Sequence, residues 1–495
     1  MKRLVRLFAL CALCSSVDVR ATPAVPPPPR DEAPLSCLPA AKPFFARAWE
    51  ALSNAHADDA RELFAQTVAV DPGCVLAWAH LGALTPGAQG RRMVDDAVSG
   101  SGAVSEVERF QVQALAAQHR GDAEQSLTLW RKARELVPRS YELNFIVAQR
   151  AAVLQLWHDA ADAARRATEL RPERGAAWNV LGYAYMGLRR PEAVAAFQRY
   201  AQVAPLEPNA HDSLGDALLA NDQLEDARAA YQRALDTSGG SFWASGHGVA
   251  TACALQQDWF CARAAIEKAR RTAPQADDKL RLMEWTAWSY LADGQPAEAF
   301  RALEDLEQDA RRLKVDARAV GAVVLRGRFL IHQGRYQDGL VVLQALGKQR
   351  WPALLEGQKL ALEAGRLHAV TEAQARLGQV REAEKTLGVL RALFDSRPRD
   401  VQGLDRVAHA RGLIALQKKD PALAISAFQQ CSEGADACRL DLAAAQEAAG
   451  DGPAAANTRT LISRANHRDP EYWWVRIRAL TPSRASPGLR DEPSL

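Results

Sequence analysis

The 495-residue sequence lacks long apolar runs and the short motifs that mark many enzymes. No apolar stretch reaches the roughly 20 residues that a membrane-spanning helix needs, so we expect no transmembrane segment. The nucleotide-binding pattern G-x4-G-K-[ST], the zinc-protease pattern H-E-x-x-H and the hydrolase pattern G-x-S-x-G are missing. We therefore predict no catalytic residues and no cofactor.

The sequence also gives little support for a metal site or for acid-base catalysis. The ten histidines are scattered, with no pair at metal-ligand spacing, and we interpret them as ordinary helix residues. Adjacent carboxylates occur at Asp58-Asp59, Asp95-Asp96 and Asp277-Asp278. Each pair lies near an expected turn or helix start, where negative charge is favoured by the helix dipole. We predict no metal site.

Excess charge of one sign is also absent. The chain has 62 basic and 59 acidic residues, and five charged residues lie in the first 21 positions: Lys2, Arg3, Arg6, Asp18 and Arg20. Without them 58 residues of each sign remain. This balance argues against a nucleic-acid partner.

What the sequence does contain is a repeated helical hairpin, clearest over residues 207–238. Its first helix carries His211, Leu214, Gly215 and Leu218 on one face, and its second carries Leu224, Ala227, Tyr231 and Ala234. Apolar residues remain on the outer faces, so such a hairpin needs neighbouring copies to bury them.

The copies follow a period of 34 residues, seen from Ala193 to Ala227 and from Phe197 to Tyr231. The run 178–185 matches the pattern W-x2-L-G-x2-Y, and in this the sequence resembles the tetratricopeptide repeat family. The resemblance implies an all-α, right-handed superhelical solenoid of about a dozen hairpins. The residues expected to pack the repeats are Trp178, Leu181, Gly182, Ala193, Phe197, Leu214, Gly215, Ala227 and Tyr231.

A second resemblance covers residues 104–138, which are similar to repeats appended to bacterial Ser/Thr kinases and winged-helix regulators. The kinase and DNA-binding parts themselves are absent from the chain.

The chain is expected to divide into seven parts. They are a signal peptide (1–21, cleaved after Ala21), a Pro-rich tether (22–41), degenerate hairpins (42–104), the best repeats (105–240), degenerate repeats (241–467), a C-terminal capping helix (468–480) and a disordered tail (481–495). Within 42–104, turn-rich stretches at 85–90 and 99–105 leave room only for a short helix, and the glycines of 243–248 predict a second irregular joint. The start of the chain could instead form a first amphipathic helix of the solenoid.

Six cysteines remain if residues 1–21 are removed: Cys37, Cys74, Cys253, Cys261, Cys431 and Cys438. Six cysteines allow fifteen pairings. The local pairs Cys253-Cys261 and Cys431-Cys438 could form disulfides, which would suit an oxidising compartment. The alternative is that these are small buried residues. No C-x2-C spacing occurs among the six, which argues against zinc.

In the resembling family the first helix of each hairpin lines a concave groove for peptides or partner domains. Counted from the repeat register of Leu214 and Gly215, the groove positions here are Asn179, Tyr183, Asp212, Asp216, His247, Trp288 and Arg328. The first four make a polar, acidic face that favours a basic or neutral extended ligand. The alternative is the solvated face of a spacer.

These observations predict an exported scaffold, periplasmic or secreted, that binds a protein or peptide and helps to assemble an envelope or secretion complex. The alternative is a cytoplasmic regulatory adaptor that works with a kinase or transcription regulator. An enzyme with a site between repeats has no positive support. Whether residues 1–21 are removed distinguishes the first two hypotheses.

Overall fold

The computed structural model describes residues 33–54, 56–397 and 400–481, and every regular element within them is helical. The predicted signal peptide and nearly all of the predicted tail lie outside the described residues. None of the described helices combines the length and apolar character needed to cross a membrane.

The chain divides into two compact units, residues 1–217 and 218–495. Unit 1 contains α2 (Lys42–Ser53), α3 (Ala57–Val70), α4 (Val75–Leu84), α5 (Gly87–Gly100), the 3-10 helix η2 (Ser101–Ala103), α6 (Glu106–His119), α7 (Ala123–Leu136), α8 (Tyr141–Val153), α9 (Trp157–Leu170), α10 (Gly175–Gly187) and α11 (Glu192–Val203). The division falls inside α12 (Pro208–Ala220).

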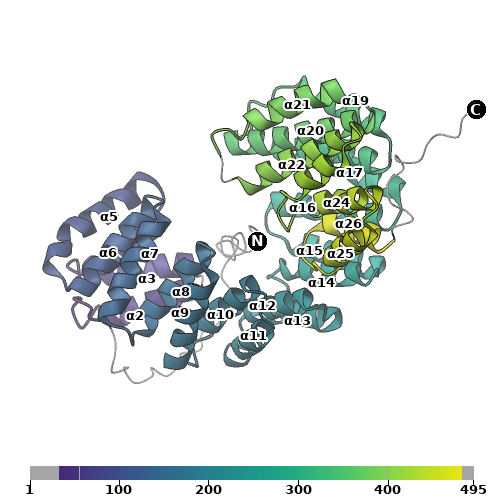
Figure 1. Ribbon diagram of the computed structural model, residues 1–495. Helices are drawn as coiled ribbons and strands as arrows, with labels where there is room; N and C mark the ends of the chain where they lie inside the picture. The colour runs from purple at the N-terminus through teal and green to yellow at the C-terminus, as the bar shows by residue number, and fades with distance from the viewer. Residues whose placement is uncertain (1–32, 55, 398–399, 482–495) are drawn as a thin grey trace, which may run out of the picture. The chain divides into compact units, whose positions relative to one another are not determined.

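Unit 2 contains α13 (Leu224–Thr237), α14 (Ser245–Leu255), α15 (Trp259–Thr272), α16 (Ala276–Ala292), α17 (Pro296–Arg312), α18 (Asp316–His332), α19 (Tyr336–Gly347), α20 (Glu356–Arg376), α21 (Val380–Ala392), α22 (Val401–Gln417), α23 (Pro421–Phe428), α24 (Asp436–Ala448), α25 (Gly452–Ser463) and α26 (Pro470–Leu480). Within each unit consecutive helices pack in pairs (Figure 1). The helices α2 to α25 thus correspond to twelve pairs, in agreement with the predicted dozen.

The turn inside each pair from α6–α7 onward uses the same backbone device. One residue, two positions after the first helix, adopts a left-handed conformation. These residues are Gly121, Gln155, Arg189, Asp222, Gln257, Gly294, Gly334, Gly378, Lys419 and Gly450. Five of them are glycines, for which this conformation carries no steric cost.

Small residues on the first helix let a large ring of the second helix come close, as the sequence predicts. A Cβ added to Gly182 would lie 2.5 Å from the Phe197 ring, and Gly412 faces Phe428 in the same way. Of the predicted packing residues, those buried are Leu181, Gly182, Ala193, Phe197, Gly215, Ala227 and Tyr231, and those half-buried are Trp178 and Leu214.

The links between pairs in unit 1 are held by a recurring hydrogen bond. The indole nitrogens of Trp78 and Trp178 donate to the carbonyl oxygens of Pro72 and Pro172, at 3.0 and 2.9 Å. Asn144 donates from its side-chain amide to the Pro138 carbonyl at 2.9 Å. The side chain six residues after each proline therefore donates to a carbonyl oxygen that lies between two helices and takes no part in helical hydrogen bonding.

Two expectations about irregular joints are wrong. The helix expected to be short within residues 85–105 is α5, which has 14 residues and packs along α4 because Gly90 and Gly82 allow close approach. The glycines of 243–248 do not break the chain either. Gly246 and Gly248 lie inside α14, where they accommodate Ala269 and the Tyr231 ring.

Unit 1 is closed by its own first helix. Trp49 of α2 packs edge-on against Phe145 of α8, with ring centroids 5.6 Å apart, and Glu50 forms an ion pair with Arg174 at 3.1 Å. The segment before α2, expected to be part of a tether, is also fixed: the backbone N–H of Ser36 donates to Glu108 at 2.7 Å. Residues 36–53 therefore belong to the folded body of unit 1.

Candidate functional site

Four predicted groove residues lie on two neighbouring first helices of unit 1, α10 and α12. The Tyr183 hydroxyl lies 3.1 Å from the Ser213 hydroxyl and donates to the Asp216 carboxylate at 3.3 Å. Asn179, one helical turn before Tyr183, has a buried side-chain oxygen without a hydrogen-bond partner. Asp212 is only 2% exposed, so it is not presented on this face as expected. The structure thus places Asn179 and Tyr183 of α10 beside Asp216 of α12, with Tyr183 only 4% exposed and the Asn179 side-chain oxygen buried.

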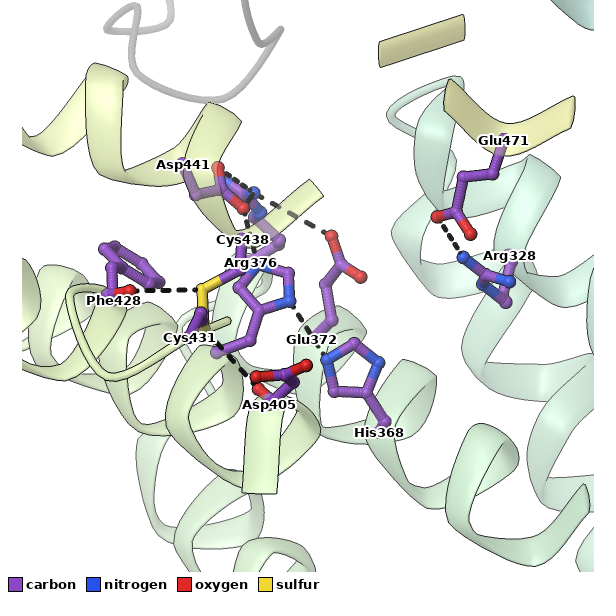
Figure 2. A network of polar contacts seen from close by, with 11 residues as sticks. Arg328, His368, Glu372, Arg376, Asp405, Phe428, Cys431, Cys438, Asp441 and Glu471 are labelled. Atoms are coloured by element: carbon purple, nitrogen blue, oxygen red, sulfur yellow. Dashed lines mark hydrogen bonds and ion pairs between the residues drawn. A yellow bond between two sulfur atoms is a disulfide. The ribbon is translucent and has the colours of Figure 1, made fainter. Parts of the chain in front are cut away.

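The other three predicted groove residues lie in unit 2 and face the chain's own C-terminal helix. Arg328 of α18 forms an ion pair with Glu471 of α26 (Figure 2) and lies over the Trp288 ring at 5.7 Å. His247 of α14 stacks on Trp285 of α16, with centroids 4.1 Å apart. Helix α26 therefore lies against the side of unit 2 that carries these residues.

The helix α26 is firmly seated there. Trp473 is 1% exposed and packs edge-on against Trp285 at 5.4 Å. The guanidinium of Arg476 donates to the Leu255 carbonyl at 2.7 Å. Helix α26, which was expected to cap the last pair, packs on α24 and α25 as well as on α14 and α16.

A buried polar network joins α20, α22 and α24 of unit 2 (Figure 2). The Nε2 of His409 lies 2.8 Å from the Asp441 carboxylate, and its Nδ1 lies 3.0 Å from the Nε2 of His368. Arg376 donates to both Asp441 oxygens, at 2.8 and 2.9 Å. Both ring nitrogens of His409 are thus engaged, one with Asp441 and the other with His368.

The charges of this network are fixed by its partners. Burial would raise the pKa of Asp441, but Arg376 and His409 together hold it below its usual range. Burial lowers the pKa of His368 well below its ordinary value, and His409 and Arg406 act in the same direction. Because both nitrogens of His409 are engaged, that ring has no nitrogen left to act as a general base. The sequence offered no signal for this pair, since His368 and His409 lie on different repeats.

The six described cysteines form three disulfides. Cys253 of α14 pairs with Cys261 of α15, and Cys431, which follows α23, pairs with Cys438 in the first turn of α24. These are the two local pairs suggested by the sequence. The third pair is Cys37–Cys74, which ties the segment before α2 to the start of α4 and was not anticipated. Within the described residues, Cys37, Cys74 and Asp71 also form a group with metal-ligand spacing. Their sulfurs are bonded to each other, and Asp71 accepts from the backbone N–H groups of Leu38 and Gly73.

The comparison with protein families agrees with this geometry. Residues 187–242 match the model of the tetratricopeptide repeat, across α11, α12 and α13. This part of the chain therefore contains a tetratricopeptide repeat. Superhelices of such repeats present extended surfaces to other proteins, so this one belongs to the protein-interaction class.

The similarity to a curated relative covers only part of the chain. The Drosophila melanogaster protein O-mannosyl-transferase Tmtc1 is 36% identical over 110 residues, which are 21% of this chain and 13% of the relative. The chain thus spans about an eighth of that relative's length.

Several solved structures resemble parts of the chain. A MamA fragment from Desulfovibrio magneticus RS-1 is 18% identical, with a TM-score of 0.32, and covers 34% of this chain and 96% of that chain. PilW, a type IV pilus biogenesis factor, is 21% identical, with a TM-score of 0.35, and covers 42% of this chain and 94% of that chain. A thermophilic tetratricopeptide-repeat protein from Thermus thermophilus is 19% identical, with a TM-score of 0.30. The match covers 36% of this chain and 96% of that chain. At these scores the similarity carries no inference about function.

Proposed function

We propose that this protein is an exported scaffold that binds an extended protein segment on unit 1, in the assembly of an envelope or secretion complex. The observation that carries the proposal is the pairing of all six described cysteines in disulfides. Disulfides persist in oxidising compartments and are rare in a reducing cytoplasm. The basic and apolar start of residues 1–21 supports export as well.

The polar cluster of Asn179, Tyr183 and Asp216 supports a ligand with hydrogen-bond donors. Asp216 supplies a carboxylate and Asn179 an acceptor oxygen without a partner. A lysine or arginine of an extended segment forms charge-assisted hydrogen bonds with acceptors of this kind. The corresponding face of unit 2 holds α26, which is why the proposal places the partner on unit 1.

The cellular location is tested by fractionating the native host and alkylating free thiols without adding a reductant. The intact mass of the protein is then measured in each fraction. A mass that begins at Thr22 with six cysteines resistant to alkylation supports export. A mass that begins at Met1 with eight alkylated thiols contradicts it and moves the protein to the cytoplasm, in favour of a regulatory adaptor.

Ligand binding is tested with fluorescent extended peptides that differ only in a central lysine or glutamate, titrated against the full chain. We expect tighter binding of the lysine peptide and a loss of about tenfold in affinity in Asp216→Asn, as for one charge-assisted hydrogen bond. The matched control is Asp162→Asn, because the Asp162 side chain is 72% exposed on α9. Equal affinity for both peptides, or an equal loss in the control, contradicts the proposed surface.

A further inference from the structure

Two histidines of unit 2 lie where its first helices meet α26. His332 of α18 stacks directly on Trp474 of α26, with ring centroids 4.0 Å apart. His247 of α14 stacks on Trp285, against which Trp473 of α26 packs at 5.4 Å. The two adjacent tryptophans of α26 therefore rest on surfaces that each include an imidazole ring.

Neither imidazole ring has a hydrogen-bond partner at Nε2, which a protonated ring would require. The Nε2 atoms of His247 and His332 are both buried without a hydrogen-bond partner. A neutral imidazole can leave this nitrogen as an unprotonated acceptor, but an imidazolium must place an N–H on both nitrogens. Burial of an N–H without an acceptor costs free energy, and burial of an unpaired charge costs more.

The groups that face His332 are mainly cations. Arg328 lies on the same helix, Arg478 faces it from α26, and Arg376 faces it from α20. The facing carboxylate is Asp441 of α24, which already holds Arg376 through both oxygens. Burial is the main cause that lowers the pKa of His332, and Arg328 and Arg478 lower it further.

His247 has a similar environment. Arg281 faces it from α16, and Arg468 faces it from the segment before α26. The Trp243 ring packs edge-on against it, with centroids 5.3 Å apart. Burial lowers the pKa of His247 well below its ordinary value, and the two arginines act in the same direction. The positive charge of a proton on His247 or His332 would thus be repelled by arginines that include Arg468 and Arg478, on or just before α26.

We propose that α26 is an acid-released clasp, which fills the face lined by α14, α16 and α18 at neutral pH and leaves it when His247 and His332 take up protons. Release gives both rings access to water and separates them from Arg468 and Arg478, which travel with α26. It also uncovers the aromatic side of α26 and the face beneath it. The inference does not depend on where unit 1 binds a partner.

The direction of the pH effect follows from linkage. In the released state an exposed imidazole titrates near 6.5, whereas in the docked state protonation is suppressed. Below pH 6.5 the released state therefore binds protons that the docked state does not, and acid favours release. At pH 5 each histidine shifts the equilibrium toward release by about thirty-fold, so both together shift it by about a thousand-fold.

The test is hydrogen exchange of the full chain, followed by mass spectrometry of peptides at pH 7 and pH 5, with times corrected for intrinsic exchange. We expect peptides that cover α26 to lose protection at pH 5, while α17 on the outer side of unit 2 keeps its protection. Unchanged protection of α26 overturns the proposal. So does parallel loss in α17, because the unit would then be unfolding as a whole.

The variant that decides the cause is His247→Phe with His332→Phe, which keeps the ring stacking but cannot be protonated. We expect α26 to stay protected at pH 5 in this variant. If the phenyl rings disturb docking at pH 7, the pair His247→Gln with His332→Gln serves in their place. His158→Gln is the control, since His158 is exposed on α9. Loss of α26 protection at pH 5 in the uncharged variants as in the wild type would show that these histidines are not the trigger.

Discussion

The side-chain amide of Asn466 donates to the carboxylate of Asp222 at 2.8 Å, although 244 residues separate them in the chain. Arg468 reinforces the contact, because its guanidinium lies over the Tyr231 ring at 4.3 Å. The first and last pairs of unit 2 are therefore joined directly. Stacked repeats usually contact only their neighbours, so this contact makes unit 2 more cooperative than an open array.

The ion pair between Arg328 and Glu471 should contribute to this closure. Arg328→Gln removes the ion pair with the Glu471 carboxylate, of which only 26% of the side chain is exposed. We expect a loss of about 1–3 kcal/mol in the free energy of unfolding, measured by urea titration, and a smaller loss when Glu471→Gln is added. The exposed pair Arg335–Asp338 is the control, and Arg335→Gln should cost less than about 0.5 kcal/mol. Equal losses at the two pairs would contradict the closure.

The close approach at Gly182 should not tolerate a side chain. An alanine Cβ would lie 2.5 Å from the Phe197 ring, which is fully buried and cannot move without disturbing α11. We expect Gly182→Ala to destabilise unit 1 by about 1–3 kcal/mol in thermal or urea unfolding. Gly434→Ala is the control, because an added Cβ there meets no atom within 4 Å.

The left-handed turn residues predict opposite effects for two substitutions. Gln155 has φ of 59° and Gly121 has φ of 83°, at equivalent turns. Gln155→Gly should stabilise by up to about 1 kcal/mol because it removes the steric cost of this conformation, and Gly121→Ala should destabilise by about 1–2 kcal/mol. Urea midpoints of the two variants test the pair. Changes of the same sign would rule out the shared turn geometry.

Unit 1 should lose stability in acid through His80. Its ring stacks on Phe64 with centroids 4.8 Å apart, and burial, aided by Arg150, lowers its pKa from 6.5 to about 3. Below pH 6.5 the unfolded chain binds a proton that the folded chain does not. The free energy of unfolding then falls by about 1.4 kcal/mol per pH unit until about pH 3. His80→Phe should remove this part of the slope in urea titrations between pH 7 and pH 4, whereas His158→Gln should leave it unchanged.

The three disulfides should differ in their contribution. Cys37–Cys74 closes a loop with a sequence separation of 37, against 8 and 7 for the other two. Chain entropy in the unfolded state predicts about 4 kcal/mol for the long loop and about 2.5 kcal/mol for each short one. Replacement of each pair by serine, followed by thermal unfolding, tests this order. A larger loss at Cys253–Cys261 than at Cys37–Cys74 would reverse it.

Much of the architecture could be predicted because it depends on local pattern. The 34-residue spacing from Phe197 to Tyr231 indicates a hairpin repeat, and small residues such as Gly182 show where two helices touch. The local pairs of cysteines were visible for the same reason. The sequence does not reveal the length of α5, because Gly90 resembles a turn residue whereas in the structure it allows close packing against α4.

The candidate site was predicted only in part. The repeat pattern placed Trp288 and Arg328 in a groove, but it gave no sign that Arg328 would pair with Glu471 of α26. The Cys37–Cys74 pair and the His368–His409 contact join segments from different repeats, and no spacing rule connects them.

The sequence by itself determined that the protein is built of tetratricopeptide hairpins, because each repeat carries its own helix signals and its own complementary small and large residues. Only the tertiary structure decided that α2 closes unit 1 and that α26 closes unit 2. Such contacts depend on the curvature that accumulates over several pairs, and that curvature comes from many small packing angles. A periodic sequence pattern specifies how each helix packs on the next one. Contact between helices that are distant in sequence, such as α14 and α26, depends on the geometry of all the pairs between them.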